Sequence, residues 1–523
     1  MLRRTLLGVV ILGRFALCNP QISSDKTEAS NKSAEVLRQI DIDRIKSSLV
    51  FLASDSLQGR ETAGPGEKKA AEFIASQFKS FGLKPLGDSG TYFQHFTVST
   101  YGIGDSTFVE GDGKYFRFGK DVLLSPFGAG DTTITAPVVF AGYGFESDSS
   151  SDYDGIDARG KIVMLLDGNP KSADTADPMV RTGLYKRSNA MRHGAVAIII
   201  IVRGGDAGFS KLQERMGSLF GAKSMTLESE AKGSRRATSL QMLYMKESAA
   251  DDFLKRTGVT TEQIAAGIDS AKIPAMKLLD KATVNVRLEF EKRQSENIVG
   301  VLEGSDPDLK NEYVVYSAHY DHLGMTNSGM VYHGADDNAS GTSTVIGIAN
   351  AYSKSNAKPK RSIMFLTVSG EEKGLLGSDY FTNHPVVPIK DIVADLNTDM
   401  DGRIDTGYVK SPTDYIYVIG SKRLSSELDS LLVAADSESV RIKLDYSFDS
   451  DNDPNKYYYR SDHYNFARRN IPVIFFFDGN NPDYHKPTDT SDKIDFRLMK
   501  QRASLILMTG WKVANIENRL RPN

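Results

Sequence analysis

The sequence predicts an α/β protein whose mostly parallel, mixed central sheet is flanked by helices and whose chain carries an inserted β-rich domain. Three observations support this class. From residue 290 onward, short apolar strands alternate with helical patterns. Between about 100 and 290, short β-rich runs alternate instead with Gly, Asp and Ser turns. The length of 523 residues suits two or three domains.

The first segment, residues 1–18, resembles a secretory signal peptide, with a basic start, a short apolar stretch and small residues near Cys18. A disordered tail is the alternative reading, and lipid attachment at Cys18 is a further option. Residues 19–33 are polar and are expected to form a flexible lead-in. We therefore expect an exported protein, periplasmic or extracellular.

The α/β domain is expected in two parts, residues 34–109 and 286–523, with the β-rich insertion at 110–285. Helical patterns dominate 34–86. The longest apolar run, Ala195–Val202, has eight mostly β-branched residues, so it predicts a buried strand and no membrane span. In the second part, the expected strands and helices are Tyr313–Ser317, Ser340–Tyr352, Ile363–Val368, Ile392–Leu396, Leu424–Ala435 and Val473–Phe477.

Composition narrows the function. The 64 Lys and Arg residues nearly balance the 67 Asp and Glu residues, for a formal net charge of -3, so the chain lacks the basic excess typical of nucleic-acid binding. A single cysteine excludes an intrachain disulfide and a cysteine-based zinc site. Any metal site must therefore use His, Asp and Glu.

Histidines and carboxylates gather behind the predicted strands of the second part. Six of the eight histidines lie between residues 319 and 485. Each polar group follows a strand or opens a helix, the edge of an open α/β sheet where ligands bind. The groups are His319-Tyr320-Asp321, the turn Gly334–Gly341, Ser369–Glu372, Asn397–Asp399 and Tyr484-His485.

Two imidazoles and several carboxylates without thiols suit zinc or a similar divalent ion. Three carboxylates and two imidazoles exceed the three protein ligands of a typical catalytic zinc. Two ions that share one carboxylate would use all five. Such a pair, about 3.5–4 Å apart, can hold a bridging hydroxide and polarise a substrate carbonyl.

The motifs AHYD, GADDNASG, SGEEKGLLGS, LNTDM and DYHKPTDT, in this order, resemble those of the dinuclear zinc aminopeptidases of metallopeptidase clan MH, related to glutamate carboxypeptidase. RSDHYNF at 460–466 is a sixth. The likeness covers roughly residues 34–100 and 290–520, and the insertion resembles a protease-associated domain. The resemblance implies the zinc exopeptidase fold, two Zn²⁺ per chain (other divalent ions being acceptable) and peptide substrates.

The resemblance also implies a role for each matching residue. Asp336 is not expected to bind metal, because the family's bridging ligand directly precedes the Asn. The implied metal ligands are His319 and Asp399 for one ion, Glu372 and His485 for the other, and Asp337 as the bridge. The implied catalytic and substrate-binding residues are Glu371 as general base, Asp321 as the partner of His319, Tyr484 at the oxyanion, and Arg460 at the substrate.

The remaining polar features have plainer interpretations. We expect His322, His333 and His384 to be structural, whereas His463 could line the pocket. The acidic loop 449–453 alternates carboxylates like a calcium loop, but the glycine and glutamate that an EF-hand needs are replaced by Pro454 and Arg460. A solvated loop is the favoured reading, and calcium stays open.

The sequence thus predicts an exported, zinc-dependent aminopeptidase that hydrolyses N-terminal residues from peptides. Carboxypeptidase or dipeptidase activity on the same scaffold is the alternative, with Arg460, Arg468 and Arg469 as candidate partners for a C-terminal carboxylate. A non-catalytic binding protein or a glutaminyl cyclase-like transferase fits less well, because all five ligands and the base are present. The preferred residue, the physiological metal, the oligomeric state and the role of the insertion stay open.

Overall fold

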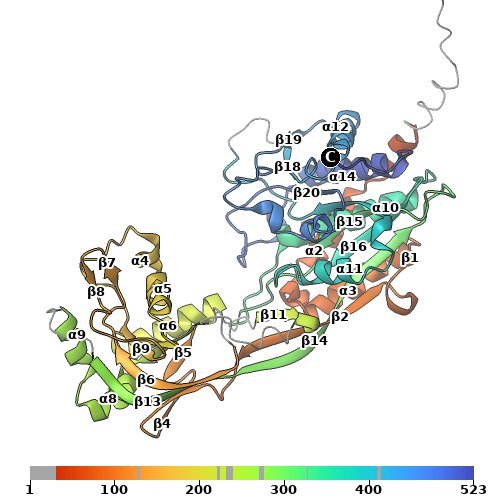
Figure 1. Ribbon diagram of the computed structural model, residues 1–523. Coiled ribbons are helices and arrows are strands. Elements are labelled where there is room, and N and C mark those ends of the chain that lie inside the picture. Colours follow the sequence, from red (N-terminus) through yellow and green to blue (C-terminus); the bar gives the residue numbers. More distant parts are fainter. Residues whose placement is uncertain are drawn as a thin grey trace, which may run out of the picture. The chain divides into compact units, whose positions relative to one another are not determined.

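The computed structural model describes residues 31–125, 130–220, 224–230, 240–269, 276–326, 328–408 and 414–523 (Figure 1). The chain divides into two compact units. One is formed by the chain up to His95 together with Ser295–Asn523, and the other by Phe96–Gln294. The predicted signal peptide, residues 1–18, lies outside the described residues and stays a prediction.

The boundaries of the inserted unit differ from the predicted 110 and 285. Both observed boundaries fall inside long strands, β2 (Phe93–Ile103) and β14 (Leu288–Leu302). A strand that continues from one unit into the next gives no change of composition at the boundary, which is why the sequence did not mark it. Residues 31–33, expected in the flexible lead-in, belong to a helical stretch at residues 31–37.

The first unit is built on a mixed sheet. Its four central strands, in the order β16-β15-β17-β20, are parallel to one another, and β14 and β18 flank them in antiparallel pairing. The expected mostly parallel, mixed sheet is therefore confirmed. The same sheet also includes β19, which pairs with β18, and β1, which pairs with β14. Strands β2 and β11 complete the sheet on the other side of β14.

The strands of the first unit are β1 (Lys84–Pro85), β15 (Tyr313–His319), β16 (Ser362–Val368), β17 (Ile392–Thr398), β18 (Tyr415–Ile419), β19 (Lys443–Asp445) and β20 (Val473–Phe477). Its α-helices are α2 (Ile42–Leu52), α3 (Pro65–Ser80), α10 (Gly341–Lys354), α11 (Leu376–Asn383), α12 (Ser426–Glu438), α13 (His463–Ala467) and α14 (Phe496–Asn515). Short helical turns are η1 (Asp55–Arg60), η2 (Asp88–Gly90), η4 (Ala335–Ser340), η5 (Ile389–Asp391), η6 (Tyr457–Tyr459) and η7 (Ser491–Lys493).

Apolar side chains alternate between the two faces of this sheet. In β15, Val314 and Tyr316 belong to the core shared with α2, α3, α10 and α14, whereas Val315 belongs to the core shared with α11 and α13. All seven residues of β16 are buried, as expected of a strand covered on both faces. Because both faces are covered, the polar residues that follow the strands can gather only at the sheet's edge.

The second unit contains an eight-stranded sheet in the order β4-β3-β13-β6-β9-β10-β12-β5. The predicted apolar strand is β10, which is buried throughout between parallel β9 and β12. The strands beyond β2 are β3 (Phe108–Gly111), β4 (Lys114–Arg117), β5 (Val122–Leu124), β6 (Thr132–Phe140), β7 (Glu146–Ser147), β8 (Ser150–Ser151), β9 (Ile162–Leu166), β10 (Ala197–Val202), β11 (Ser224–Leu227), β12 (Gln241–Lys246) and β13 (Met276–Val286). The helices are α4 (Pro178–Thr182), α5 (Leu184–Arg192), α6 (Gly205–Phe220), α8 (Glu247–Leu254), η3 (Lys255–Thr257) and α9 (Thr261–Asp269).

The expected elements of the second α/β part are all present, with small differences at their ends. Strands β15 and β17 each run two residues further than predicted, and α10 and α12 are displaced by one to three residues. Among the described residues, no helix is both long and apolar enough to cross a membrane.

Candidate metal centre

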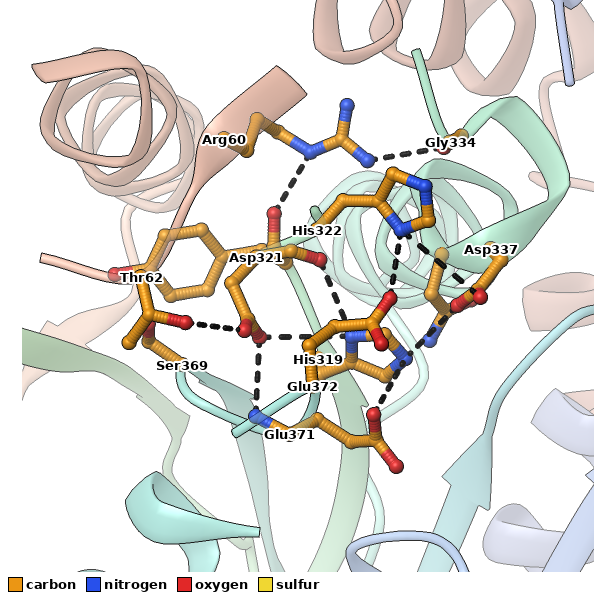
Figure 2. A network of polar contacts seen from close by, with 12 residues as sticks. Arg60, Thr62, His319, Asp321, His322, Gly334, Asp337, Ser369, Glu371 and Glu372 are labelled. Atoms are coloured by element: carbon orange, nitrogen blue, oxygen red, sulfur yellow. Dashed lines mark hydrogen bonds and ion pairs between the residues drawn. The ribbon is translucent and has the colours of Figure 1, made fainter. Parts of the chain in front are cut away.

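The metal-ligand candidates converge at one edge of the first unit's sheet. His319 ends β15, and the segment Ser369–Glu372 directly follows β16. Asp399 directly follows β17, and His485 lies in the loop after β20. Because these four strands are parallel neighbours, their carboxyl ends meet, and Figure 2 shows His319, Asp337 and both glutamates around one centre.

The first ligand group surrounds the imidazole of His319. Its Nε2 lies 3.2 Å from Oδ1 of Asp399 and 3.4 Å from Oδ1 of Asp337. The three side chains come from three separate elements, and their ligand atoms are close enough together to hold a metal ion.

The second group shares Asp337. Nε2 of His485 lies 3.1 Å from Oδ2 of Asp337 and 3.2 Å from Oε2 of Glu372. Asp337 therefore turns Oδ1 toward the first group and Oδ2 toward the second. A carboxylate with one oxygen in each group has the geometry of a bridging ligand.

The charges of these groups depend on one another. Burial opposes ionisation of Asp337, but hydrogen bonds from His319 and His485 hold its pKa well below the usual range. Burial and the neighbouring Asp337 raise the pKa of Glu372, yet hydrogen bonds from His322 and His485 outweigh them and bring it to about 2. Burial lowers the pKa of His485, whereas the two carboxylates raise it to about 10. Here protons on the imidazoles neutralise the carboxylates, and a metal ion would replace them.

The turn η4 directs Asp337 and Asp336 to opposite partners. The backbone N–H groups of both residues donate to the carboxylate of Asp489. The Asp336 side chain accepts from Gly402 N at 2.9 Å and from Nδ2 of Asn481 at 2.8 Å, away from the ligand groups. The structure thus separates the two adjacent aspartates, and Asp337 is the one that faces the ligand groups.

Asp321 connects His319 to the segment that carries the glutamates. Its Oδ2 accepts from Thr62 Oγ1 at 2.7 Å, and its Oδ1 accepts from Glu371 N at 3.2 Å. Nδ1 of His319 lies 3.6 Å from Oδ1 of Asp321 and 3.3 Å from its carbonyl oxygen. Both acceptors favour the tautomer that carries a proton on Nδ1 and leaves Nε2 free for a metal.

Glu371 lies beside the ligands in a pocket that opens from the metal groups. Burial raises the pKa of its carboxyl well above the usual value, although the charge of His319 partly opposes the rise. The other lining residues are Asp337, Asp399, Met400, Tyr457, Arg460, Phe475, Phe477, Asn480 and Tyr484. The pocket thus combines a carboxylate edge, an aromatic wall and one guanidinium.

Tyr484 and Arg460 both line this pocket, as a substrate-contacting role requires. The Tyr484 ring stacks on His485 at 3.9 Å between centroids, and burial raises the pKa of its phenol. Arg460 is exposed and lies 5.0 Å from the ring centroid of Tyr457. By contrast, Arg468 and Arg469 contact Asp379 and Asn383 of α11, and neither lines the pocket.

Three further histidines have structural roles, including His463, which was considered a possible pocket residue. His463 is buried and stacks on the pocket residue Phe475, so it supports the pocket wall without lining it. His333 contacts Asp55, and His384 is exposed and stacks on Tyr380, as structural residues do.

The sequence analysis predicted that His322 is a structural residue. It is buried, but its contacts differ from those of an ordinary core histidine. Its Nδ1 lies 2.7 Å from Oε1 of Glu372 and 3.9 Å from Oδ2 of Asp337, so the ring belongs to the site. The sequence did contain a signal for this position. His322 lies three residues after His319, the ligand candidate that ends β15, and is therefore close to the site.

Two buried residues of the early helical segment were also missed. Arg60, within the connection read as polar, donates to the carbonyl oxygens of Tyr320 and Gly334 at 2.8 and 2.9 Å. It thereby fastens the end of β15 to the turn that precedes Asp337. Glu67, at the start of α3, accepts from the hydroxyl of Ser369 at 2.5 Å.

The acidic loop 449–453 has its carboxylates already engaged. Asp449 and Asp451 both accept from the guanidinium of Arg423, at 2.8 and 2.7 Å, and Asp453 accepts from Tyr457 N at 3.0 Å. The arginine occupies the position that a cation would need. Among the described residues, two groups could hold a metal ion, and both lie at the sheet edge. One is His319 with Asp337 and Asp399, and the other is His322 with Asp337 and Glu372.

Glu67 gives a prediction about stability. Burial, partly opposed by hydrogen bonds from Ser295 and Ser369, raises its pKa from 4.5 to about 8. Between these values the folded state binds more protons than the unfolded state, so the unfolding free energy falls as pH rises, by at most about 1.4 kcal/mol per pH unit. Glu67→Gln should remove this decline. Denaturant unfolding can be followed by the fluorescence of Trp511, the single tryptophan. The unfolding free energy of the variant relative to the parent should rise from about pH 5 to pH 8 and stay constant above pH 8. A pH-independent difference would contradict the prediction.

The donor set fits a divalent metal. Imidazole nitrogens and carboxylate oxygens from five side chains point at two centres, and most of these side chains are shielded from water. Thiols are absent from the site, which suits zinc bound through N and O ligands. The sheet edge therefore defines a metallohydrolase site.

Comparison with known proteins finds similar peptidases. Residues 297–510 match the model of peptidase family M28. Aminopeptidase YwaD of Bacillus subtilis (strain 168) is 23% identical over 495 residues, covering 90% of this chain and 85% of that protein. The solved aminopeptidase of Aneurinibacillus sp. strain AM-1 has a TM-score of 0.52 at 22% identity, covering 94% of this chain and 98% of that one. A zinc aminopeptidase from Bacillus subtilis has a TM-score of 0.50 at 19% identity, covering 92% and 97%.

Fold and site together define a metallopeptidase. The matched residues 297–510 include all five metal-ligand candidates, Glu371 and Tyr484. The part of the chain that carries the site is therefore similar to peptidase family M28.

Proposed function

We propose that this chain is an exported aminopeptidase that uses two zinc ions to hydrolyse the N-terminal residue from peptides. One observation carries the proposal. The pocket beside the metal groups is lined by three carboxylates, those of Asp337, Glu371 and Asp399, which complement the charged amine of a free peptide N-terminus. The relatives named above, which are aminopeptidases by name, support the same activity.

The metal ions, when bound, would supply Lewis-acid polarisation of the scissile carbonyl and lower the pKa of a water molecule. Glu371 would accept the proton of the attacking water and later donate it to the leaving amine. Its carboxylate lies 4.0 Å from Nε2 of His319, further than the Asp399 and Asp337 oxygens at 3.2 and 3.4 Å. Tyr484, on the opposite loop, would donate to the oxyanion.

Attack on the C-terminal residue is the alternative on this scaffold. It needs a cationic pocket for the substrate carboxylate. Of the three candidate arginines, only Arg460 lines the pocket, and three carboxylates line the same pocket. We therefore assign Arg460 to contacts along the peptide and expect the amine, not the carboxylate, to be bound at the metal end.

The test is mass spectrometry of a mixed peptide pool after incubation with the purified, zinc-loaded protein. We expect ladders shortened from the N-terminus, while N-acetylated copies of the same peptides stay intact. Ladders shortened from the C-terminus, or cleavage of dipeptides alone, would replace the substrate class. No cleavage by protein that binds two ions would favour a binding function.

The N-terminal segment and the inserted unit also have proposed roles. We propose that residues 1–18 direct export and that the inserted unit is a protease-associated domain. Secretion of the full chain, but not of a variant lacking residues 2–18, would support export, and equal secretion of both would contradict it. The insertion could limit substrate length; unchanged length preference after removal of residues 110–285 would contradict that role.

A further inference from the structure

His322 and Glu372 form a buried pair at the second metal group. Nδ1 of His322 lies 2.7 Å from Oε1 of Glu372, and the imidazole is completely buried. Because an ionised carboxylate only accepts, Nδ1 is the donor. The other oxygen of Glu372, Oε2, lies 3.2 Å from Nε2 of His485. The two oxygens of Glu372 therefore have separate partners. Figure 2 shows the contacts of His322 with Glu372 and with Asp337.

The surroundings of His322 hold its ring in this orientation. Gly334 has a φ of +54°, and a Cβ at that position would lie 2.5 Å from Cγ and Cδ2 of the imidazole. The ring thus packs against backbone that only glycine allows so close. Arg60 fixes both sides of this contact, because its carbonyl oxygen accepts from His322 N at 3.0 Å and its Nη2 donates to Gly334 O at 2.9 Å. These contacts hold the imidazole in one orientation.

We propose that His322 is a positioning residue for the second metal ion: its Nδ1–H holds Oε1 of Glu372, so that Oε2 alone faces the ion. This inference rests on the proposed two-ion site. An outer hydrogen bond of this kind fixes the orientation of a ligand and strengthens its binding. His322 would therefore act through Glu372 without touching the ion or the substrate.

Direct binding of His322 to the ion is the competing role. It would require Nδ1, which is 3.9 Å from Oδ2 of Asp337, to give up the hydrogen bond to Glu372. Nε2 is buried without a hydrogen-bond partner in the described part of the chain, so the ring offers no second contact to compensate. The short Nδ1 contact favours the positioning role.

The experiment compares His322→Ala with His322→Asn and His322→Gln. Asn places an amide donor near the position of Nδ1, whereas Gln moves the donor one bond further out. Zinc affinities come from competition with a chromophoric chelator, and the visible absorption of bound Co²⁺ reports the geometry of each site. His333→Ala is the matched control, because His333 lies in the same loop but contacts Asp55.

We expect His322→Ala to keep the first ion and to bind the second about 10–100-fold more weakly. His322→Asn should recover most of that loss, and His333→Ala should bind both ions normally. Unaltered binding of the second ion by His322→Ala would overturn the inference. So would an Asn variant as weak as Ala with the fold intact by circular dichroism, because the imidazole would then be a direct ligand.

Two further results are distinguishable. If His322→Ala fails to fold, the Asn and Gln variants decide: tighter second-ion binding by Asn than by Gln supports the positioning role, and equal binding contradicts it. If the unaltered protein binds only one ion, the proposed two-ion function fails, and the inference fails with it, before any variant is made.

Discussion

Replacing Glu371 with Gln should lower kcat about 10²- to 10⁴-fold, the usual contribution of a general acid–base residue. The amide cannot accept the proton of the attacking water, while it keeps nearly the same shape in the pocket. Because Glu371 lies further from His319 than the Asp399 and Asp337 oxygens do, the variant should still bind two ions. Steady-state kinetics on an unblocked peptide and metal analysis of the same sample measure both effects.

The neighbouring Glu372→Gln is the matched control for this experiment. Its Oε2 lies 3.2 Å from Nε2 of His485, so the change should weaken the second ion, in contrast to Glu371→Gln. A Glu371→Gln enzyme that keeps more than a tenth of the parent kcat would rule out Glu371 as the base. Loss of metal from that variant would move Glu371 into the ligand set.

Asp337→Asn should cost more than any other single ligand change. Oδ1 of Asp337 faces His319 and Oδ2 faces His485, so one substitution weakens both ion positions. An amide is neutral and offers only one oxygen, and it cannot bridge two ions as a carboxylate does. We expect bound zinc below one ion per chain at stoichiometric metal, and kcat/KM reduced by about a thousandfold or more, equivalent to several kcal/mol of transition-state stabilisation.

Asp336→Asn provides an adjacent control. Burial, together with Asp478 and Asp489, raises the pKa of Asp336 well above the usual value. Asn has nearly the same shape and is neutral, so it is a close substitute. This variant should keep both ions and most of the activity. Equal metal loss in the two variants would show that the turn η4, and not the bridging carboxylate, is what the substitutions damage.

The strand edge was predictable from the sequence because three of the site segments lie at or just after the end of an apolar run. The runs before His319, Glu371 and Asp399 are strands β15, β16 and β17, and parallel neighbours necessarily bring such residues together. Segments spread over 167 positions could therefore be predicted to meet at one site, whereas the role of each ligand candidate was implied by the family resemblance.

The supporting residues were not predictable in the same way. Arg60 lies in a polar connection and Glu67 at the start of α3, where a charged residue is ordinarily exposed. Both are buried beneath the site, where Arg60 donates to backbone carbonyls and Glu67 accepts from a hydroxyl. His322 resembled an ordinary core histidine, because its distance to Glu372 depends on a turn that the sequence does not specify. The boundaries of the inserted unit were missed because they lie within the continuous strands β2 and β14.

The most direct test of the two-ion centre is anomalous diffraction at the zinc absorption edge from crystals of the zinc-loaded protein. We predict two anomalous peaks about 3.5–4 Å apart, one beside His319 and Asp399 and the other beside Glu372 and His485. The carboxylate of Asp337 should lie between them, with one oxygen directed at each peak. A single peak, or two peaks without Asp337 between them, would contradict the bridging site on which the proposed function depends.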